Sequence, residues 1–227
     1  MNKSIAFKKS QSGFTLVEIA IVLVIIGLLL GGVLKGTELI ENAKVKRAVS
    51  EINGVTAALY AYQDRYQRLP GDDGPIGTLT ARGGPWTVTA AGNNNGAIVS
   101  ALGQTFTAAN AEHVGFWQHL KAAGFISGKP SDVGVASLPR NAFGGLIGLT
   151  TASVGNPVNP LTGRIVCSSQ VPGKSAAALD TQLDDGDGNA GRVRATAAAA
   201  GANTPPTPAA LAAPYNEASI YTLCVQM

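Results

Sequence analysis

The clearest pattern in the sequence is one long apolar run near its start. Residues 14–34 read FTLVEIAIVLVIIGLLLGGVL, 21 residues with a single charged side chain, Glu18. A helix of this length spans about 30 Å, the thickness of the hydrocarbon core of a bilayer. A helix buried inside a globular domain is the alternative, but such helices rarely run this far without a polar face. The pattern therefore predicts a membrane-spanning helix.

The helical pattern continues past the apolar run. Residues 35–68 contain no proline, and apolar side chains recur at spacings of three, four or seven, which places them on one helix face. Pro70 and Gly71 end the pattern. We therefore expect one helix over 14–68, whose first half (14–34) lies in the membrane and whose second half (35–68) carries the rest of the chain.

Residues 69–227 read as a small globular head. Turn-forming residues dominate 69–112, an apolar stripe predicts a short helix over 111–128, and 195–214 is a low-complexity stretch that we interpret as a surface loop. Four segments are prone to form strands: 146–151, 164–168, 191–194 and 220–225. The predicted fold class is α+β, with a small antiparallel sheet packed against the exposed half of the long helix.

The net charge of +3 lies at the N-terminal tip. Lys3, Lys8 and Lys9 precede the apolar run with no acid among them, which leaves 17 − 3 = 14 basic and 14 acidic side chains in the rest of the chain. Lysines before an apolar run hold that end in the cytoplasm. Because the remainder is neutral, the charge gives little support to a nucleic acid as partner.

The residues around the start of the apolar run resemble a known processing signal. Gly13-Phe14-Thr15-Leu16-Val17-Glu18, followed by a long aliphatic run, is similar to the signature of type IV prepilins and of type II secretion pseudopilins. In that family a membrane peptidase cuts after the glycine and methylates the new N-terminus. The resemblance implies that residues 1–13 are a cleaved leader, Gly13 the cleavage residue, Phe14 the methylated terminus and Glu18 the acid required for assembly.

A function follows from the resemblance. It implies a structural subunit, a pilin or minor pilin of a type IV pilus, with a pseudopilin of type II secretion as the alternative. The implied partners are other pilin subunits, the prepilin peptidase and methyltransferase, the inner-membrane assembly platform, and lipid before assembly. The subunit would cross the inner membrane once with its head in the periplasm, and then enter a surface filament or a periplasmic pseudopilus.

Glu18 fits this interpretation physically. An acid within the bilayer is costly and therefore functional by default, and it needs a partner. The apolar run contains no Lys or Arg. Cleavage after Gly13 would create an amine at Phe14, one helical turn away, which could pair with Glu18 of the same or a neighbouring subunit. The alternative is that Glu18 simply sits at the membrane interface.

The chain has two cysteines, Cys167 and Cys224. Two buried free thiols and one disulfide are both compatible with this count. The expected export of the head favours the disulfide, because disulfides persist in oxidising compartments. Many type IV pilins close a C-terminal loop in this way, and the resemblance implies the same pairing here.

An acidic segment in the head is a candidate calcium loop. Its oxygen-bearing side chains are Asp184, Asp185, Asp187 and Asn189. Alternate positions 185, 187 and 189 match the first half of a calcium loop, but Ala190 and Thr196 stand where such a loop needs glycine and glutamate. The other interpretation is an Asp/Gly-rich turn whose side chains cap its own backbone. The family requires no cofactor, so calcium is the single candidate.

Catalysis is not indicated. His113 and His119 are six residues apart, with no nucleophile pattern beside them, and we expect both on a helix surface. The chain offers no zinc-like Cys/His spacing and no phosphate loop. We therefore predict that the protein is not an enzyme, and a membrane-anchored periplasmic enzyme or binding domain is the third alternative.

Overall fold

The computed structural model describes residues 13–107, 111–209 and 214–227. The predicted leader lies outside these residues except for Gly13. The chain divides into two compact units, residues 1–41 and residues 42–227.

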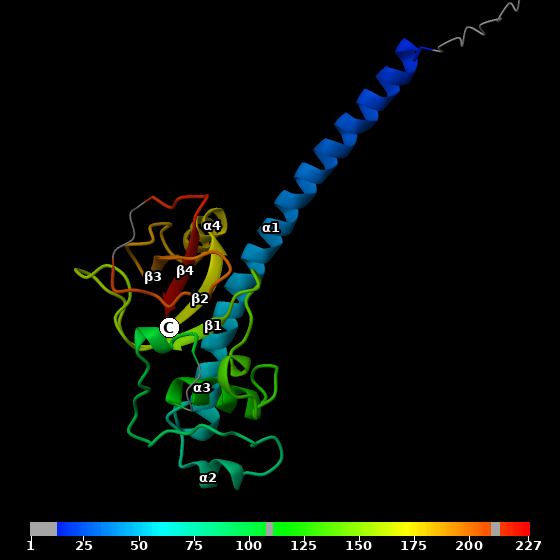
Figure 1. Cartoon of the computed structure of the whole chain (residues 1–227). Helices are drawn as coiled ribbons and strands as arrows, with labels where there is room; N and C mark the ends of the chain where they lie inside the picture. Colours follow the sequence, from blue (N-terminus) through cyan, green and yellow to red (C-terminus); the bar gives the residue numbers. More distant parts are fainter. Residues whose placement is uncertain (1–12, 108–110, 210–213) are drawn as a thin grey trace, which may run out of the picture. The chain divides into compact units, whose positions relative to one another are not determined.

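The helix α1 covers Leu16–Tyr66 (Figure 1). In the first unit every residue from Phe14 to Lys35 is exposed. In the second unit the helix buries one face, whose members are Val45, Ala48, Ile52, Val55, Ala58, Leu59 and Tyr62. Their spacing of three or four residues is that of a helix stripe. The predicted end at residue 68 is two residues too late, because Gln67 already has a positive φ of 54°.

Four strands form one antiparallel sheet in the order β1-β2-β4-β3. The strands are β1 Ile147–Thr150, β2 Ile165–Pro172, β3 Val193–Ala198 and β4 Ile220–Gln226. The C-terminal strand β4 lies between β2 and β3, so β3 joins the sheet only through pairing with the last strand of the chain. The α+β class, with a long helix packed against a small antiparallel sheet, is confirmed.

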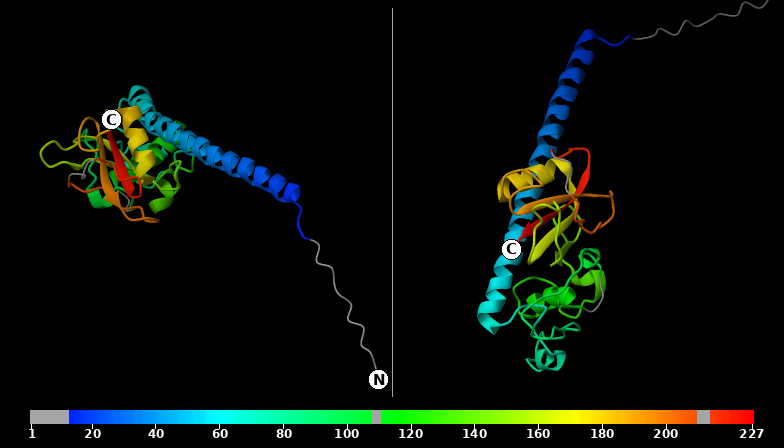
Figure 2. Two further views of the ribbon diagram at one scale, coloured as in Figure 1. Left: turned by 90° about the horizontal axis from the view of Figure 1, so that it is seen from above. Right: turned by 90° about the vertical axis from the view of Figure 1, so that its left-hand side faces the viewer.

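Two apolar clusters join α1 to the rest of the head. Val45, Ala48 and Ile52 pack with side chains of β2, β3, β4 and α4 (Gly173–Leu183). Val55, Leu59 and Tyr62 pack with side chains of α3 (Glu112–Ala122) and of the sheet. One stripe of α1 therefore supports two layers in succession, the sheet with α4 and then the region around α3 (Figure 2).

The structure corrects one prediction about the second half of the head and adds a helix that was not predicted. β3 continues to Ala198, so 195–198 belong to a strand and not to the low-complexity loop. Ala195 and Thr196 are fully or almost fully buried, so this part of the strand is internal. The helix α4 was not predicted, because its buried face consists of small side chains, Leu179 and Asp180, which form a weak periodic signal.

The first half of the head also differs in detail. The loop-like stretch 69–112 contains a short helix, α2 (Ile76–Thr80), and a turn of 3-10 helix at Leu102–Gln104; a second such turn lies at Gly134–Ser137. The helix predicted over 111–128 stops at Ala122, because the chain reverses at Gly124, where φ is +78°. Glycine adopts this left-handed conformation without the steric cost of a side chain.

Candidate assembly site

Gly13 and Phe14 lie just before α1. Neither belongs to a helix or strand, and Phe14 is 84% exposed. The bond between them is therefore in an open, irregular segment, a form in which a peptidase can bind a chain. Cleavage of the bond between Gly13 and Phe14 stays a prediction.

Glu18 lies in the first turn of α1 and closes a capping box. Its carboxylate accepts hydrogen bonds from the Thr15 backbone N–H at 2.8 Å and from the Thr15 hydroxyl at 2.7 Å, while the Glu18 N–H donates to Thr15 Oγ1 at 3.2 Å. Such reciprocal bonds satisfy N–H groups that a helix start leaves without partners. Thr15 was missed by our sequence reasoning, although the spacing T-x-x-E was a signal for it.

The first unit has the composition of a membrane span. Of the helices in the described residues, α1 alone is long and apolar enough to cross a bilayer, judged by length and composition. Gly27, Gly31, Gly32 and Gly36 offer no Cβ, and nothing lies within 4 Å of the positions a Cβ would take. Their spacing of four residues leaves shallow strips where another helix can approach closely.

Cys167 and Cys224 form a disulfide in the head. They are direct partners in the register of β2 and β4, and both are fully buried. The bridge therefore ties the last strand of the chain to the strand beside it, across 57 residues of sequence.

The acidic segment forms a turn between α4 and β3. Asp180 Oδ1 accepts from the Gly186 N–H at 3.2 Å, and the Tyr215 hydroxyl donates to Asp180 Oδ2 at 2.5 Å. Burial raises the pKa of Asp180 above its ordinary value, although both hydrogen bonds favour its charged form. Asp180 was not among the predicted ligands, and it is the buried member of the group.

The remaining acids cap this turn. Asp184 accepts from the backbone N–H groups of Arg192 and Val193. Asp185 accepts from the Asp187 N–H at 2.9 Å, and Asp187 from the Asn189 N–H at 3.0 Å. These are the contacts of the capped-turn interpretation.

The fit to calcium is partial. One oxygen each from Asp180, Asp184 and Asp185 lies within 4.8 Å of the others, and carboxylate oxygens are the ligands that calcium prefers. Among the predicted carboxylate ligands, Asp184 and Asp185 belong to this group and Asp187 does not. Calcium binding at this turn stays a prediction.

The two histidines are buried, which corrects their expected place on the surface. His119 Nδ1 accepts from the Gly71 N–H at 2.9 Å, and His119 Nε2 lies 2.9 Å from the Ala90 carbonyl oxygen. Burial lowers the pKa of His119 to about 4. His113 lies 3.2 Å through Nε2 from the Thr107 carbonyl oxygen, and burial lowers its pKa too. The error arose because α3 is enclosed on nearly all sides, so that even its polar positions are internal.

An ion pair between the buried Asp73 and the partly exposed Arg82 lies beside His119. Asp73 accepts from the Tyr62 hydroxyl at 2.7 Å and pairs with Arg82 at 2.9 Å. Burial and the Asp73 carboxylate raise the pKa of Tyr62. These contacts join α1 to the segment 69–82, which contains α2, so they contribute to the packing of the head.

The comparisons with known proteins bear on the N-terminal segment. Residues 8–34 match the family model of the prokaryotic N-terminal methylation motif, and this range contains Gly13, Phe14 and Glu18. No curated protein matches the chain. With this motif in front of a pilin-like α+β fold, the chain carries the signature of the type IV pilins and pseudopilins.

Proposed function

We propose that this chain is a structural subunit, a pilin or minor pilin, of a type IV pilus. It is processed after Gly13 and polymerises through α1. The observation that carries the proposal is the exposed apolar face of the first unit together with the methylation motif on the same residues.

The apolar half of α1 needs a partner. Its large side chains are roughly half to nine-tenths exposed, from Ile26 at 46% to Leu16 at 91%. Burying one such side chain is worth about 1.5–3 kcal/mol, so this segment is stable only in lipid or against other apolar helices. Lipid holds the subunit before assembly, and helices of neighbouring subunits replace the lipid in the filament. The strips at Gly27/Gly31 and Gly32/Gly36 allow those helices to approach closely.

Glu18 supplies the polar contact of assembly. Processing after Gly13 creates a charged amine at Phe14, and N-methylation of that amine preserves its charge. The amine of one subunit pairs with Glu18 of a neighbour, so that both charges are neutralised away from water. Thr15 holds the Glu18 carboxylate at the start of the helix, which fixes where the partner amine must lie and thereby sets the stagger between subunits.

The remaining partners follow from this route. The prepilin peptidase removes the leader and methylates Phe14, and the assembly platform of the inner membrane extracts the subunit from lipid. The subunit crosses that membrane once with its head in the periplasm, and then joins a filament on the cell surface. It has no enzymatic role of its own.

A pseudopilin of type II secretion is the second candidate, because the same motif serves both machines. Deletion of the gene separates them. Loss of surface filaments with normal enzyme export supports the pilus, whereas blocked export with filaments intact supports the pseudopilus.

The direct test is intact-mass and N-terminal peptide analysis of protein from the native membrane or sheared filament fraction. We expect a chain that starts at N-methylated Phe14. Gly13→Leu should accumulate with its leader uncut, while Gly27→Ala serves as the matched control and should be processed normally. Glu18→Ala should be processed but not recovered in filaments. A wild-type chain that still starts at Met1 would overturn the proposal.

A further inference from the structure

A second site lies in the head, at the end of α1 that follows the buried stripe. A cavity of about 410 Å³ opens there, lined by the last turn of α1, the loop 82–86 and the end of α3. Its size is in the range of small-ligand sites. Three basic side chains line it, and each comes from a different one of these segments: Arg65, Arg82 and Lys121.

Lys121 is the most unusual of the three. Its side chain is 4% exposed, and its ammonium lies 3.5 Å from the carboxylate of Asp132, a residue that is 31% exposed. Burying an ammonium is costly unless it is well paired, and a single contact of this length compensates the charge only in part. A Cβ at Gly128 would lie 2.6 Å from Lys121 Cε, so the following loop is shaped to cover this lysine.

Arg82 is held rigidly against aromatic rings. Its Cζ lies 4.5 Å from the ring centroid of Trp86 and 4.8 Å from that of Tyr66. One edge of the guanidinium pairs with Asp73 at 2.9 Å. A second nitrogen of the guanidinium donates to the Tyr62 hydroxyl at 3.4 Å. Since arginine has five N–H donors in a fixed plane, donors remain that Asp73 and Tyr62 do not use, and the rings hold them in a set direction.

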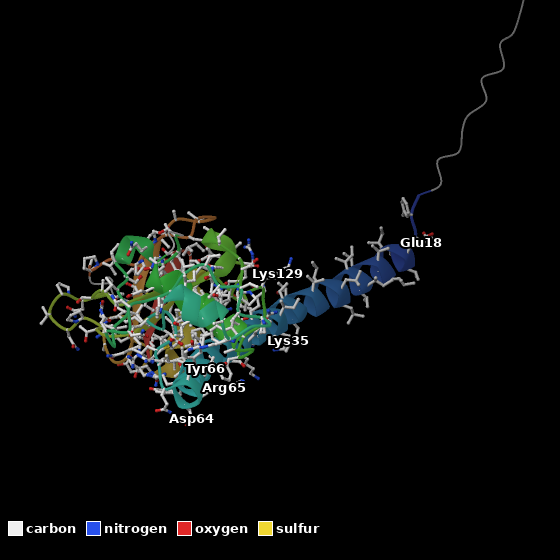
Figure 3. The ribbon with its side chains drawn as sticks, turned by 90° about the horizontal axis from the view of Figure 1, so that it is seen from below. Glu18, Lys35, Asp64, Arg65, Tyr66 and Lys129 are labelled. Atoms are coloured by element: carbon white, nitrogen blue, oxygen red, sulfur yellow. A yellow bond between two sulfur atoms is a disulfide. The ribbon has the colours of Figure 1, made fainter. Side chains whose placement is uncertain are left out.

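Arg65 completes the group. Its Cζ lies 5.3 Å from the ring centroid of Tyr66, and the two residues are neighbours on the last turn of α1 (Figure 3). In the part of the chain that the structure describes, Arg65 has no carboxylate within ion-pair distance. The ammonium of Lys121 is paired with Asp132 and covered at Gly128, so Arg65 and Arg82 are the cations that a ligand in the cavity can reach. Asp73 balances Arg82, which leaves a net charge of 2 − 1 = +1 from these three groups.

We infer that this cavity binds an oxyanion, a phosphate or carboxylate group presented by a small molecule or by the end of a larger one. Arg82 provides the fixed positive charge, and Arg65 reaches the ligand from the exposed side; Lys121 lines the cavity beneath them with its ammonium paired to Asp132. Charge-assisted bonds to guanidinium groups are the strong, directional contacts that oxyanions make with proteins. The site does not depend on processing or on filament assembly.

The test uses the full chain in detergent micelles, labelled with ¹⁵N, at constant ionic strength set with sodium chloride. Inorganic phosphate, D-glucuronate and D-glucose are added separately while the backbone amides of Gly83 and Gly84 are followed by NMR. We expect saturable shifts with phosphate or glucuronate and none with glucose. Saturation by phosphate alone assigns a phosphate ester as ligand, and saturation by glucuronate alone assigns a carboxylate.

Variants decide which charges matter. Because Arg65 is exposed, Arg65→Gln should keep the fold. It should weaken binding at least tenfold, a difference of about 1.4 kcal/mol in binding free energy. Arg140→Gln removes an exposed arginine whose hydrogen bond goes to the Gly144 carbonyl, and binding should not change. Arg82→Met, compared at equal fraction folded, should abolish saturation. Equal affinity in Arg65→Gln, binding of glucose as tight as that of glucuronate, or no saturation with either anion would overturn the inference.

Discussion

The buried His119 predicts a specific loss of stability in mild acid. Its Nδ1 accepts a hydrogen bond from the Gly71 N–H, so this nitrogen must be unprotonated, and Nε2–H donates to the Ala90 carbonyl. A second proton on the ring would remove the acceptor and place a charge in the core. Replacement of His119 by Gln removes the titrating ring and leaves an amide of similar reach.

The magnitude follows from two pKa values. Burial lowers the pKa of His119 to about 4 in the folded head, whereas an exposed histidine in the unfolded chain has a pKa of about 6.5. Between these values the unfolded state binds more protons, so stability is lost as pH falls. The full loss is about 3 kcal/mol, of which about 2 kcal/mol is reached at about pH 5.

Other groups contribute to the same pH range. Burial lowers the pKa of His113, which adds a loss of the same sign. Burial raises the pKa of Asp180, which acts in the opposite direction because the folded state then binds more protons as pH falls. The useful quantity is therefore the difference between wild type and His119→Gln, in which both of these contributions cancel.

The assay is urea unfolding of the full chain in detergent micelles at about pH 8 and about pH 5. Fluorescence of the buried Trp86 and Trp117 reports on the head. His119→Gln should be less stable than wild type at the higher pH but should lose about 2 kcal/mol less between the two conditions. His113→Gln is the matched control and should keep most of the pH dependence. Equal pH dependence in wild type and His119→Gln would refute the reasoning.

Three further predictions concern the disulfide, the helix start and the acidic turn. Replacing Cys167 and Cys224 together by serine should lower the free energy of unfolding by about 4 kcal/mol in the chain-entropy model, and a loss under about 1 kcal/mol in urea unfolding would contradict that model. Thr15→Val removes the capping oxygen and should destabilise the first turn of α1 by about 1 kcal/mol, seen as faster amide exchange at Glu18; Thr15→Ser should behave as wild type, and unchanged exchange in Thr15→Val would argue against the capping box. Millimolar calcium should raise the Tm of the full chain and Asp185→Asn should abolish the rise, whereas a Tm unaffected by both calcium and chelator would leave the turn capped by its own side chains alone.

Local patterns in the sequence were enough for the features that depend on a continuous stretch of chain. The apolar run from Phe14 to Leu34 can be recognised from sequence alone, because a helix that spans a bilayer needs about 20 apolar residues and few charges. The stripe of α1 that the head buries repeats with the helix period, so the apolar positions of 35–68 were predicted on one face, and Val45, Ile52 and Leu59 of that face are buried. The motif at Gly13 to Glu18 consists of consecutive residues, so it is likewise recognisable without knowledge of the fold.

The tertiary structure decided the features that depend on what surrounds a residue. α3 is covered on nearly all sides, so His113 and His119 became internal, although their spacing indicated a surface. α4 is rich in alanine, and the extra residues of β3 are alanine and threonine; the burial of such small side chains depends on their neighbours and leaves almost no periodic signal. Convergence of Arg65, Arg82 and Lys121 on one cavity depends on three segments far apart in the sequence. Periodicity records the shape of one element, whereas burial and convergence depend on packing between elements, and only the folded chain contains that information.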